Sequence, residues 1–156
     1  MIRFLKLIFL LFFCSNLLAQ QATIDLNKNW QFTNANKTKW YMATVPGTVH
    51  TDLLANKLIP DPFFGDNEKR LQWIDTCDWI YKTTFVINEK YLIGNSAEII
   101  FDGLDTYADV YLNDKLLLKA NNMFRGWNVD VKPFLKIGKN ILKINFHSAK
   151  NTVDSI

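Results

Sequence analysis

The sequence predicts an all-β protein that folds as an antiparallel β-sandwich or jelly roll. About eight short segments rich in aromatic and β-branched residues follow one another, with turn-forming residues between them. Helical periodicity is nearly absent along the chain. Short strands at close spacing are typical of these two architectures. About 137 residues after an N-terminal leader suffice for one domain with a single core.

The first strand candidates are short. Alternation over residues 22–26 and 30–33 is weak, and the turn-like residues 27–29 separate these two segments. Residues 40–45 form a better strand candidate, which Pro46 ends because proline has no backbone N–H for a strand ladder.

Residues 45–68 form a long crossing between strand-like segments. Three of the four prolines lie in it, yet its aromatic and aliphatic content argues against disorder. Thr48 is placed to cap a short helix, with Asp52 near the positive end of that helix. A second short helix fits the segment from Asp66 or Asn67 to Trp73, capped by the acidic or amide side chain at its start. We therefore expect one or two short helices in the 46–75 crossing.

The strand pattern becomes strong after the crossing. The segments that alternate or carry β-branched and aromatic residues are 78–87, 98–102, 107–112, 115–120, 127–131 and 141–148. Asn113-Asp114 separates the third and fourth of these, and such a pair favours a two-residue hairpin turn. In that hairpin, Ala108, Val110 and Leu112 are expected to share one face.

The N-terminus has the pattern of a secretory signal peptide. Arg3 and Lys6 precede a short apolar run, and Ala19 stands before polar residues, so residues 1–19 are predicted to be removed. Residues 20–156 then form the exported domain, periplasmic or extracellular. The apolar run is too short to span a bilayer. Bulky Phe13 before Cys14 argues against a lipid anchor.

The charge balance excludes some partners. Removing residues 1–19 takes two of the 18 basic residues and none of the 15 acidic ones, so the net charge falls to +1. This balance predicts no binding to nucleic acid or to an anionic membrane.

Few residues suit metal or redox chemistry. His50 and His147 lie far apart, and Cys77 is the single cysteine beyond the leader, so we expect no metal, no cofactor and no intrachain disulfide. Cys77 is expected to be a free, buried thiol. The sequence also contains no Gly-rich phosphate loop and no Gly-x-Ser-x-Gly motif.

Aromatic and polar residues cluster around the end of the crossing. Trp73 and Trp79 lie close to Asp75, Asp78 and the acidic or amide residues 66–68. Sugars present flat C–H faces and a ring of hydroxyls, so such a cluster fits a saccharide site. The alternative is that Trp79 is a core residue and that Trp73 covers the edge of the core.

Five motifs in order resemble the sugar-binding-like N-terminal domain of glycoside hydrolase family 2, in its β-mannosidase branch. They are V-P-G-T-V-H at 45–50, D-N-E at 66–68 followed by Trp73, D-W-I-Y at 78–81, G-L-D-T-Y-A-D-V-Y-L-N at 103–113 and N-M-F-R at 122–125. The match covers nearly the whole chain beyond the leader.

The resemblance implies a galactose-binding-domain-like jelly roll that packs against immunoglobulin-like domains and a (β/α)-barrel of the same polypeptide. In that family a retaining mechanism uses two glutamates of the barrel. Neither can be assigned within these 156 residues. No residue here is therefore expected to be catalytic, and the chain alone is expected to be inactive.

These considerations give three functional hypotheses. The first is the N-terminal non-catalytic domain of an exported β-mannosidase-like enzyme that hydrolyses terminal, non-reducing β-D-mannose residues of β-mannosides. The second is an autonomous carbohydrate-binding module, and the third is a non-functional truncated fragment.

Individual residues receive expected roles. Asn67, Trp73 and Asp78 are the candidate substrate-binding residues, with Trp73 stacking on the sugar and the other two bonding hydroxyls or supporting the loop. The residues assigned to packing are Trp79, Tyr81, Val110 and Phe146. The apolar residues expected to be exposed, because they would meet a partner domain, are Leu58, Ile59, Phe63 and Phe64.

Overall fold

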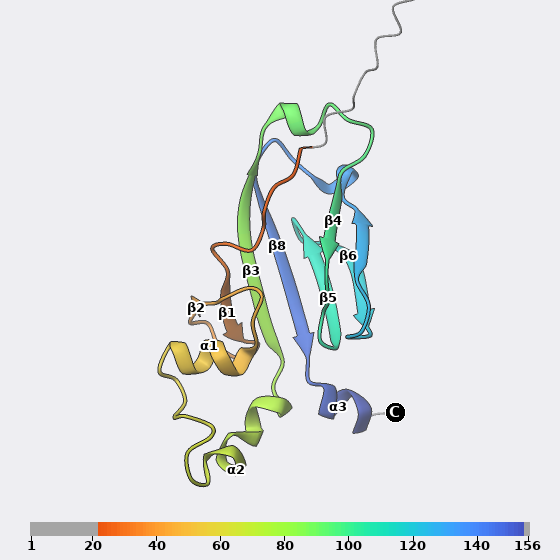
Figure 1. Ribbon diagram of the computed structural model, residues 1–156. Helices are drawn as coiled ribbons and strands as arrows, with labels where there is room; N and C mark the ends of the chain where they lie inside the picture. The colour runs from red at the N-terminus through yellow and green to blue at the C-terminus, as the bar shows by residue number, and fades with distance from the viewer. Residues whose placement is uncertain (1–21, 155–156) are drawn as a thin grey trace, which may run out of the picture.

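The computed structural model describes residues 22–154, and the predicted signal peptide lies outside them. The described part is an antiparallel β-sandwich (Figure 1). Its larger sheet has the strand order β2-β1-β3-β8-β5-β6, and its smaller sheet pairs β4 with β7. The strands are β1 Gln31–Asn34, β2 Tyr41–Met42, β3 Trp79–Ile87, β4 Glu98–Phe101, β5 Tyr107–Leu112, β6 Lys115–Asn121, β7 Trp127–Asp130 and β8 Gly138–His147. The predicted fold class is confirmed.

The pairing of β3 with β8 forms the middle of the larger sheet. The two strands run antiparallel, with a register that extends from Trp79 opposite Phe146 to Ile87 opposite Gly138. On its other side β8 pairs with β5, which forms a hairpin with β6. Asn113 and Asp114 in the turn of this hairpin have φ angles of 50° and 64°. Positive φ at both central residues is the geometry that the predicted two-residue turn requires.

The core lies between the two sheets and under α1. Ala108, Val110 and Leu112 are fully buried along β5, which confirms the predicted face. The ring of Phe32 stacks on that of Tyr81, with centroids 5.6 Å apart. Phe146 meets the other side of Tyr81 edge-on, also at 5.6 Å.

The packing roles are confirmed. Trp79, Tyr81 and Val110 are buried in the core, and Phe146 is half-buried against it. Cys77 is free and only partly buried against this core, so full burial of the thiol was a wrong expectation.

One strand prediction near the N-terminus was wrong, and another gave too long a strand. Residues 22–26 form no strand, and the 40–45 segment is reduced to the two residues of β2. Side chains satisfy backbone groups here instead of a ladder. The indole N–H of Trp30 donates to the carbonyl of Leu26 at 2.6 Å. The N–H of Thr44, two residues beyond β2, donates to the carboxylate of Asp52 at 2.8 Å.

The crossing contains the expected short helices, α1 Val49–Ala55 and α2 Asn67–Leu71. A 3₁₀ helix, η1 Gln72–Thr76, continues α2. Thr48 caps α1 as predicted, and its side chain accepts a bond from Thr51 N–H while the Thr51 hydroxyl accepts from Thr48 N–H. The cap expected for the second helix was wrong, because the Asp66 side chain makes no cap hydrogen bond.

Short helical segments also occupy several connections. They are η2 Glu89–Tyr91, η3 Lys132–Phe134 and α3 Ala149–Asp154. None of the helices among residues 22–154 is long and apolar enough to cross a membrane.

Candidate functional site

Several helical segments gather at the end of the sandwich where β8 finishes (Figure 1). They come from the crossing, as α2 and η1, and from the chain after β8, as α3. The hydroxyl of Ser148, just before α3, donates to the carbonyl of Asp75 at 2.6 Å. The Asn151 side chain donates to the carbonyl of Thr76 at 2.9 Å. These bonds tie α3 to η1, so chain segments more than 70 residues apart build one surface.

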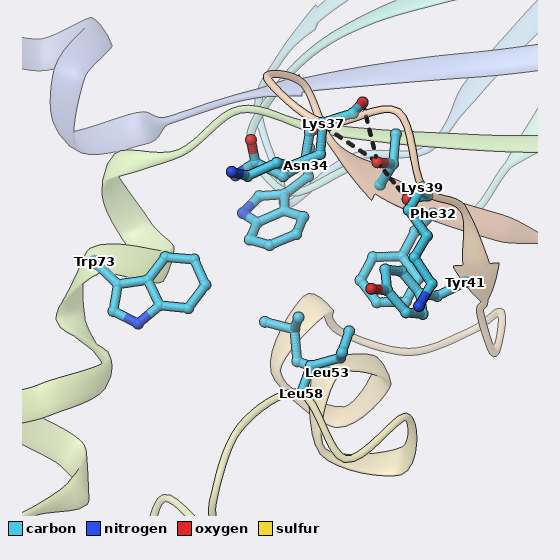
Figure 2. Close-up of a pocket in the computed structure, with 10 residues that line it drawn as sticks. Phe32, Asn34, Lys37, Lys39, Tyr41, Leu53, Leu58 and Trp73 are labelled. Carbon is cyan, nitrogen blue, oxygen red and sulfur yellow. Dashed lines mark hydrogen bonds between the residues drawn. The ribbon is translucent and has the colours of Figure 1, made fainter.

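Trp73 lies beside a cavity of about 240 Å³ between η1, α1 and the β1–β2 connection (Figure 2). We call this the Trp73 cavity. Its lining is mostly aromatic and aliphatic, and the residues are Phe32, Thr33, Asn34, Lys37, Lys39, Tyr41, Leu53, Leu58, Trp73 and Trp79. The centroids of Trp73 and Trp79 are 6.2 Å apart. Trp79 is fixed by its N–H bond of 3.1 Å to the carbonyl of Ile74. Trp73 thus both covers the core edge and presents an exposed ring.

Asn67 stabilises the loop that precedes α2. Its amide donates to the carbonyl of Asp61 at 2.8 Å, and the Asp61 carboxylate accepts from the N–H of Phe63 at 2.9 Å. The side chain of Asn67 therefore sets the conformation of the segment that carries Phe63.

Asp78 joins the start of β3 to the end of β8. One carboxylate oxygen accepts from the N–H of Ser148 at 2.7 Å, and the other lies 3.4 Å from Nδ1 of His147. Nε2 of His147 lies 3.1 Å from a carboxylate oxygen of Asp109 on β5. An imidazole with a carboxylate at each nitrogen donates to both only in its protonated form. This chain of polar groups connects three neighbouring strands.

The structure does not gather the three predicted sugar-binding residues around one cavity. Trp73 lines the cavity shown in Figure 2, whereas Asn67 and Asp78 do not. Both polar side chains are engaged in bonds within the chain, which fits the supporting role that was one of the two expected for them.

A second cavity, of about 560 Å³, lies between α1, α2, η1 and α3. We call it the polar cleft, and its lining residues are His50, Pro62, Phe63, Glu68, Leu71, Gln72, Asp75 and Lys150. Nε2 of His50 lies 3.9 Å from the carboxylate of Asp75, across the cleft from α1 to η1. Sequence reasoning pointed to the acidic part of this region but missed His50 and Lys150, because the sequence gives no sign that α1 and α3 meet η1.

Sequence reasoning also missed a buried polar pair. Asp52 is fully buried, and its carboxylate accepts bonds from the N–H of Thr44 and the hydroxyl of Tyr81. Burial raises the pKa of Asp52 above its ordinary value, while these two bonds oppose the rise. Burial and the neighbouring Asp52 carboxylate raise the pKa of Tyr81. The Tyr81 phenol therefore stays protonated and acts as a donor.

Most of the apolar residues expected to be exposed are so. Phe63 and Phe64 have exposed fractions of 97% and 77%, and Leu58 is exposed too. Ile59 contradicts the expectation, because only 7% of it is exposed and it packs into the core. Among residues 22–154, no group of three or more histidine, cysteine or acidic residues is placed to hold a metal ion.

Comparison with known sequences identifies relatives over most of the chain. The family described as glycosyl hydrolase 2 galactose-binding domain-like matches residues 30–156. β-Mannosidase B of Thermothelomyces thermophilus is 42% identical over 135 residues, which cover 85% of this chain and 16% of that protein. β-Mannosidase of Rattus norvegicus is 36% identical over 146 residues, which cover 93% of this chain and 16% of the relative.

Comparison with solved structures also identifies a β-mannosidase as similar to this chain. The β-D-mannosidase of Dictyoglomus thermophilum superposes with a TM-score of 0.83 at 39% identity, over 85% of this chain and 16% of that one. A β-D-glucuronidase of the same organism superposes with a TM-score of 0.60 at 19% identity, which shows a shared fold. The chain thus spans 16% of the length of these β-mannosidases.

Proposed function

The chain belongs to the glycosyl hydrolase 2 galactose-binding domain-like family, and we propose that it is the N-terminal, non-catalytic domain of an exported β-mannosidase-like glycoside hydrolase. The observation that carries the proposal is the match to β-mannosidases over 85–93% of this chain but 16% of each relative. The whole enzyme would hydrolyse terminal, non-reducing β-D-mannose residues in β-mannosides. The two carboxylates that such retaining chemistry needs would come from a barrel domain of the same polypeptide.

The domain would dock the rest of the enzyme through the crossing. Leu58 and Phe64 expose apolar side chains on one stretch of the crossing. Burying a side chain of this size contributes about 1.5–3 kcal/mol. Contact with an immunoglobulin-like or barrel domain would bury these side chains and gain that free energy. In an isolated domain the side chains would stay exposed to water, and the free energy would not be gained.

The same end of the sandwich would form part of the wall of the substrate pocket. Trp73 would offer its exposed ring to a sugar, while Asn67 and Asp78 would hold the loop and the end of β8 in place. The bonds from Asn67 to Asp61 and from Ser148 to Asp78 support these two roles.

Enzyme assays test the proposal. The coding DNA would be read beyond the Ile156 codon, and the full polypeptide that it specifies would be expressed beside the 156-residue chain. We expect the longer protein to hydrolyse an aryl β-D-mannoside and the 156-residue chain to show no turnover. Measurable turnover by the 156-residue chain would overturn the non-catalytic assignment. A stop codon directly after Ile156 would favour the carbohydrate-binding module or the non-functional fragment.

Export is tested separately. Residues 1–19 would be fused to a reporter enzyme that is active only outside the cytoplasm. We expect an exported, active reporter, with cleavage after Ala19 detected by N-terminal sequencing of the product. An Arg3→Glu/Lys6→Glu variant, which reverses the charge of the leader, serves as the control and should reduce export.

A further inference from the structure

The polar cleft has the size of a small-molecule site. Its volume of about 560 Å³ falls within the range of about 300–1,000 Å³ that is typical of ligand pockets. Four separate elements contribute to its lining, since His50 comes from α1, Glu68 from α2, Asp75 from η1 and Lys150 from α3.

The polar groups of the cleft favour a neutral ligand with many hydroxyls. Glu68 and Asp75 bring two carboxylates, which Lys150 offsets in part, and Gln72 adds a neutral amide. A phosphate or carboxylate ligand would meet both acidic side chains, which disfavours it. A hydroxyl both donates and accepts, so it can bond to a carboxylate, an amide and an ammonium group alike.

Phe63 places an apolar aromatic ring beside these polar groups. Its ring is 97% exposed although it lines the cleft, and Leu71 forms a buried apolar part of the lining. An aromatic ring next to hydrogen-bonding groups matches a pyranose, which has an apolar C–H face and a polar edge. The two bonds that run through Asn67 and Asp61 hold the backbone of the Phe63 segment.

The opposite walls of the cleft are already joined in the free chain. Ser148 and Asn151 bond to the carbonyls of Asp75 and Thr76, which sets α3 against η1. Lys150 lies between the two residues that make these bonds. Little ordering would therefore be needed on binding, and preformed walls reduce the entropic cost of binding.

We infer that the polar cleft binds a pyranose ring, with Phe63 against its C–H face and Glu68, Gln72 and Asp75 bonded to its hydroxyls. That the sugar is a β-mannoside rests on the proposed function. The cleft itself rests on the geometry above.

The test is a titration of the purified 156-residue chain with methyl β-D-mannopyranoside and with β-1,4-mannobiose, followed by NMR. We expect saturable shifts of the amide signals of residues 62–75 and of Lys150. Glu68→Gln and Asp75→Asn should each weaken binding by about tenfold, the loss of one strong hydrogen bond. Phe63→Ala should weaken it by about threefold to tenfold.

Phe124→Ala is the matched control, since Phe124 is also strongly exposed but does not line the cleft. It should bind as the wild type does, and circular dichroism would confirm that all four variants are folded. Methyl β-D-galactopyranoside tests which sugar is recognised. Binding of the galactoside and not of the mannosides would support the cleft and contradict the β-mannoside assignment.

Two results would overturn the inference. One is the absence of saturable shifts with either mannoside or with the galactoside, which would leave Phe63 as a contact for another domain and leave the enzyme assay above unaffected. The other is binding that Glu68→Gln, Asp75→Asn and Phe63→Ala all leave unchanged, because the saccharide would then occupy a different part of the surface.

Discussion

The hydroxyl of Tyr81 on β3 donates a hydrogen bond of 2.9 Å to the carboxylate of Asp52 in α1. The other carboxylate oxygen accepts the N–H of Thr44 at 2.8 Å, just before the crossing enters α1. Asp52 thus joins the sheet, the helix and the start of the crossing at one buried point. The position of α1 over the core depends on this polar link as well as on apolar contacts.

Tyr81→Phe should therefore lower the free energy of unfolding by about 1–3 kcal/mol, because it leaves a buried carboxylate oxygen without its donor. Urea denaturation measures the loss. Tyr111→Phe is the control, since Tyr111 is half-exposed on the same sheet and should change stability by less than about 0.5 kcal/mol. Equal losses in the two variants would contradict the role of the Asp52–Tyr81 bond.

Asp52→Asn should change how stability depends on pH. Burial raises the pKa of Asp52 above 3.8 in the folded chain. Protonation therefore stabilises the fold at low pH, and this contribution is lost as the pH rises from the unfolded to the folded pKa. Asparagine does not ionise, so the stability of the variant relative to the wild type should rise as the pH increases above 3.8. Denaturation at several pH values measures the trend, and a constant difference would contradict it.

Gly47→Ala should destabilise the entry to the crossing. A Cβ atom at this position would clash with the carbonyl oxygen of Thr44, and the N–H of Thr44 bonds Asp52. We expect a loss of about 1–3 kcal/mol in the free energy of unfolding, as for other overpacked sites. Gly94→Ala would place its Cβ atom 3.8 Å from the carbonyl oxygen of Ser96, an ordinary van der Waals contact, and should have little effect on thermal stability.

Ile59 and Phe63 should respond in opposite ways to truncation. Ile59→Ala should cost about 2–5 kcal/mol because Ile59 is buried in the core. Phe63→Ala should change stability by less than about 0.5 kcal/mol, since its ring is almost wholly exposed. Thermal or urea denaturation of the 156-residue chain measures both. A large loss for Phe63→Ala would contradict the view that this ring is available for a ligand or another domain.

Asp78→Ala should loosen the end of β8. The substitution removes the acceptor of the Ser148 N–H and one of the two carboxylates beside His147. We expect a loss of about 1–2 kcal/mol and faster hydrogen exchange of the α3 amides. Asp102→Ala, at an exposed position between β4 and β5, should leave both unchanged. Unchanged exchange in α3 after Asp78→Ala would contradict the anchoring role.

The fold class, most strands and the hairpin at residues 113–114 could be predicted from the amino-acid sequence. These features depend on alternation and turn chemistry within a few residues, which a single sequence contains. The cap of α1 could be predicted as well, because Thr48 and Thr51 are three residues apart. The ordered motifs indicated the family, which the match over residues 30–156 establishes.

The contacts between polar groups that are distant in the sequence became known from the three-dimensional structure. Asp52 is hydrogen-bonded to Tyr81, which lies 29 residues further along the chain. Asp78 is hydrogen-bonded to Ser148, which lies 70 residues further along. The polar cleft exists because α1 and α3 both reach η1, and Ile59 is buried because the crossing folds back onto the core. Such contacts depend on how the elements pack in three dimensions. Local patterns in the sequence do not predict that packing. They indicate whether a side chain is buried or exposed, but not which distant residue it contacts.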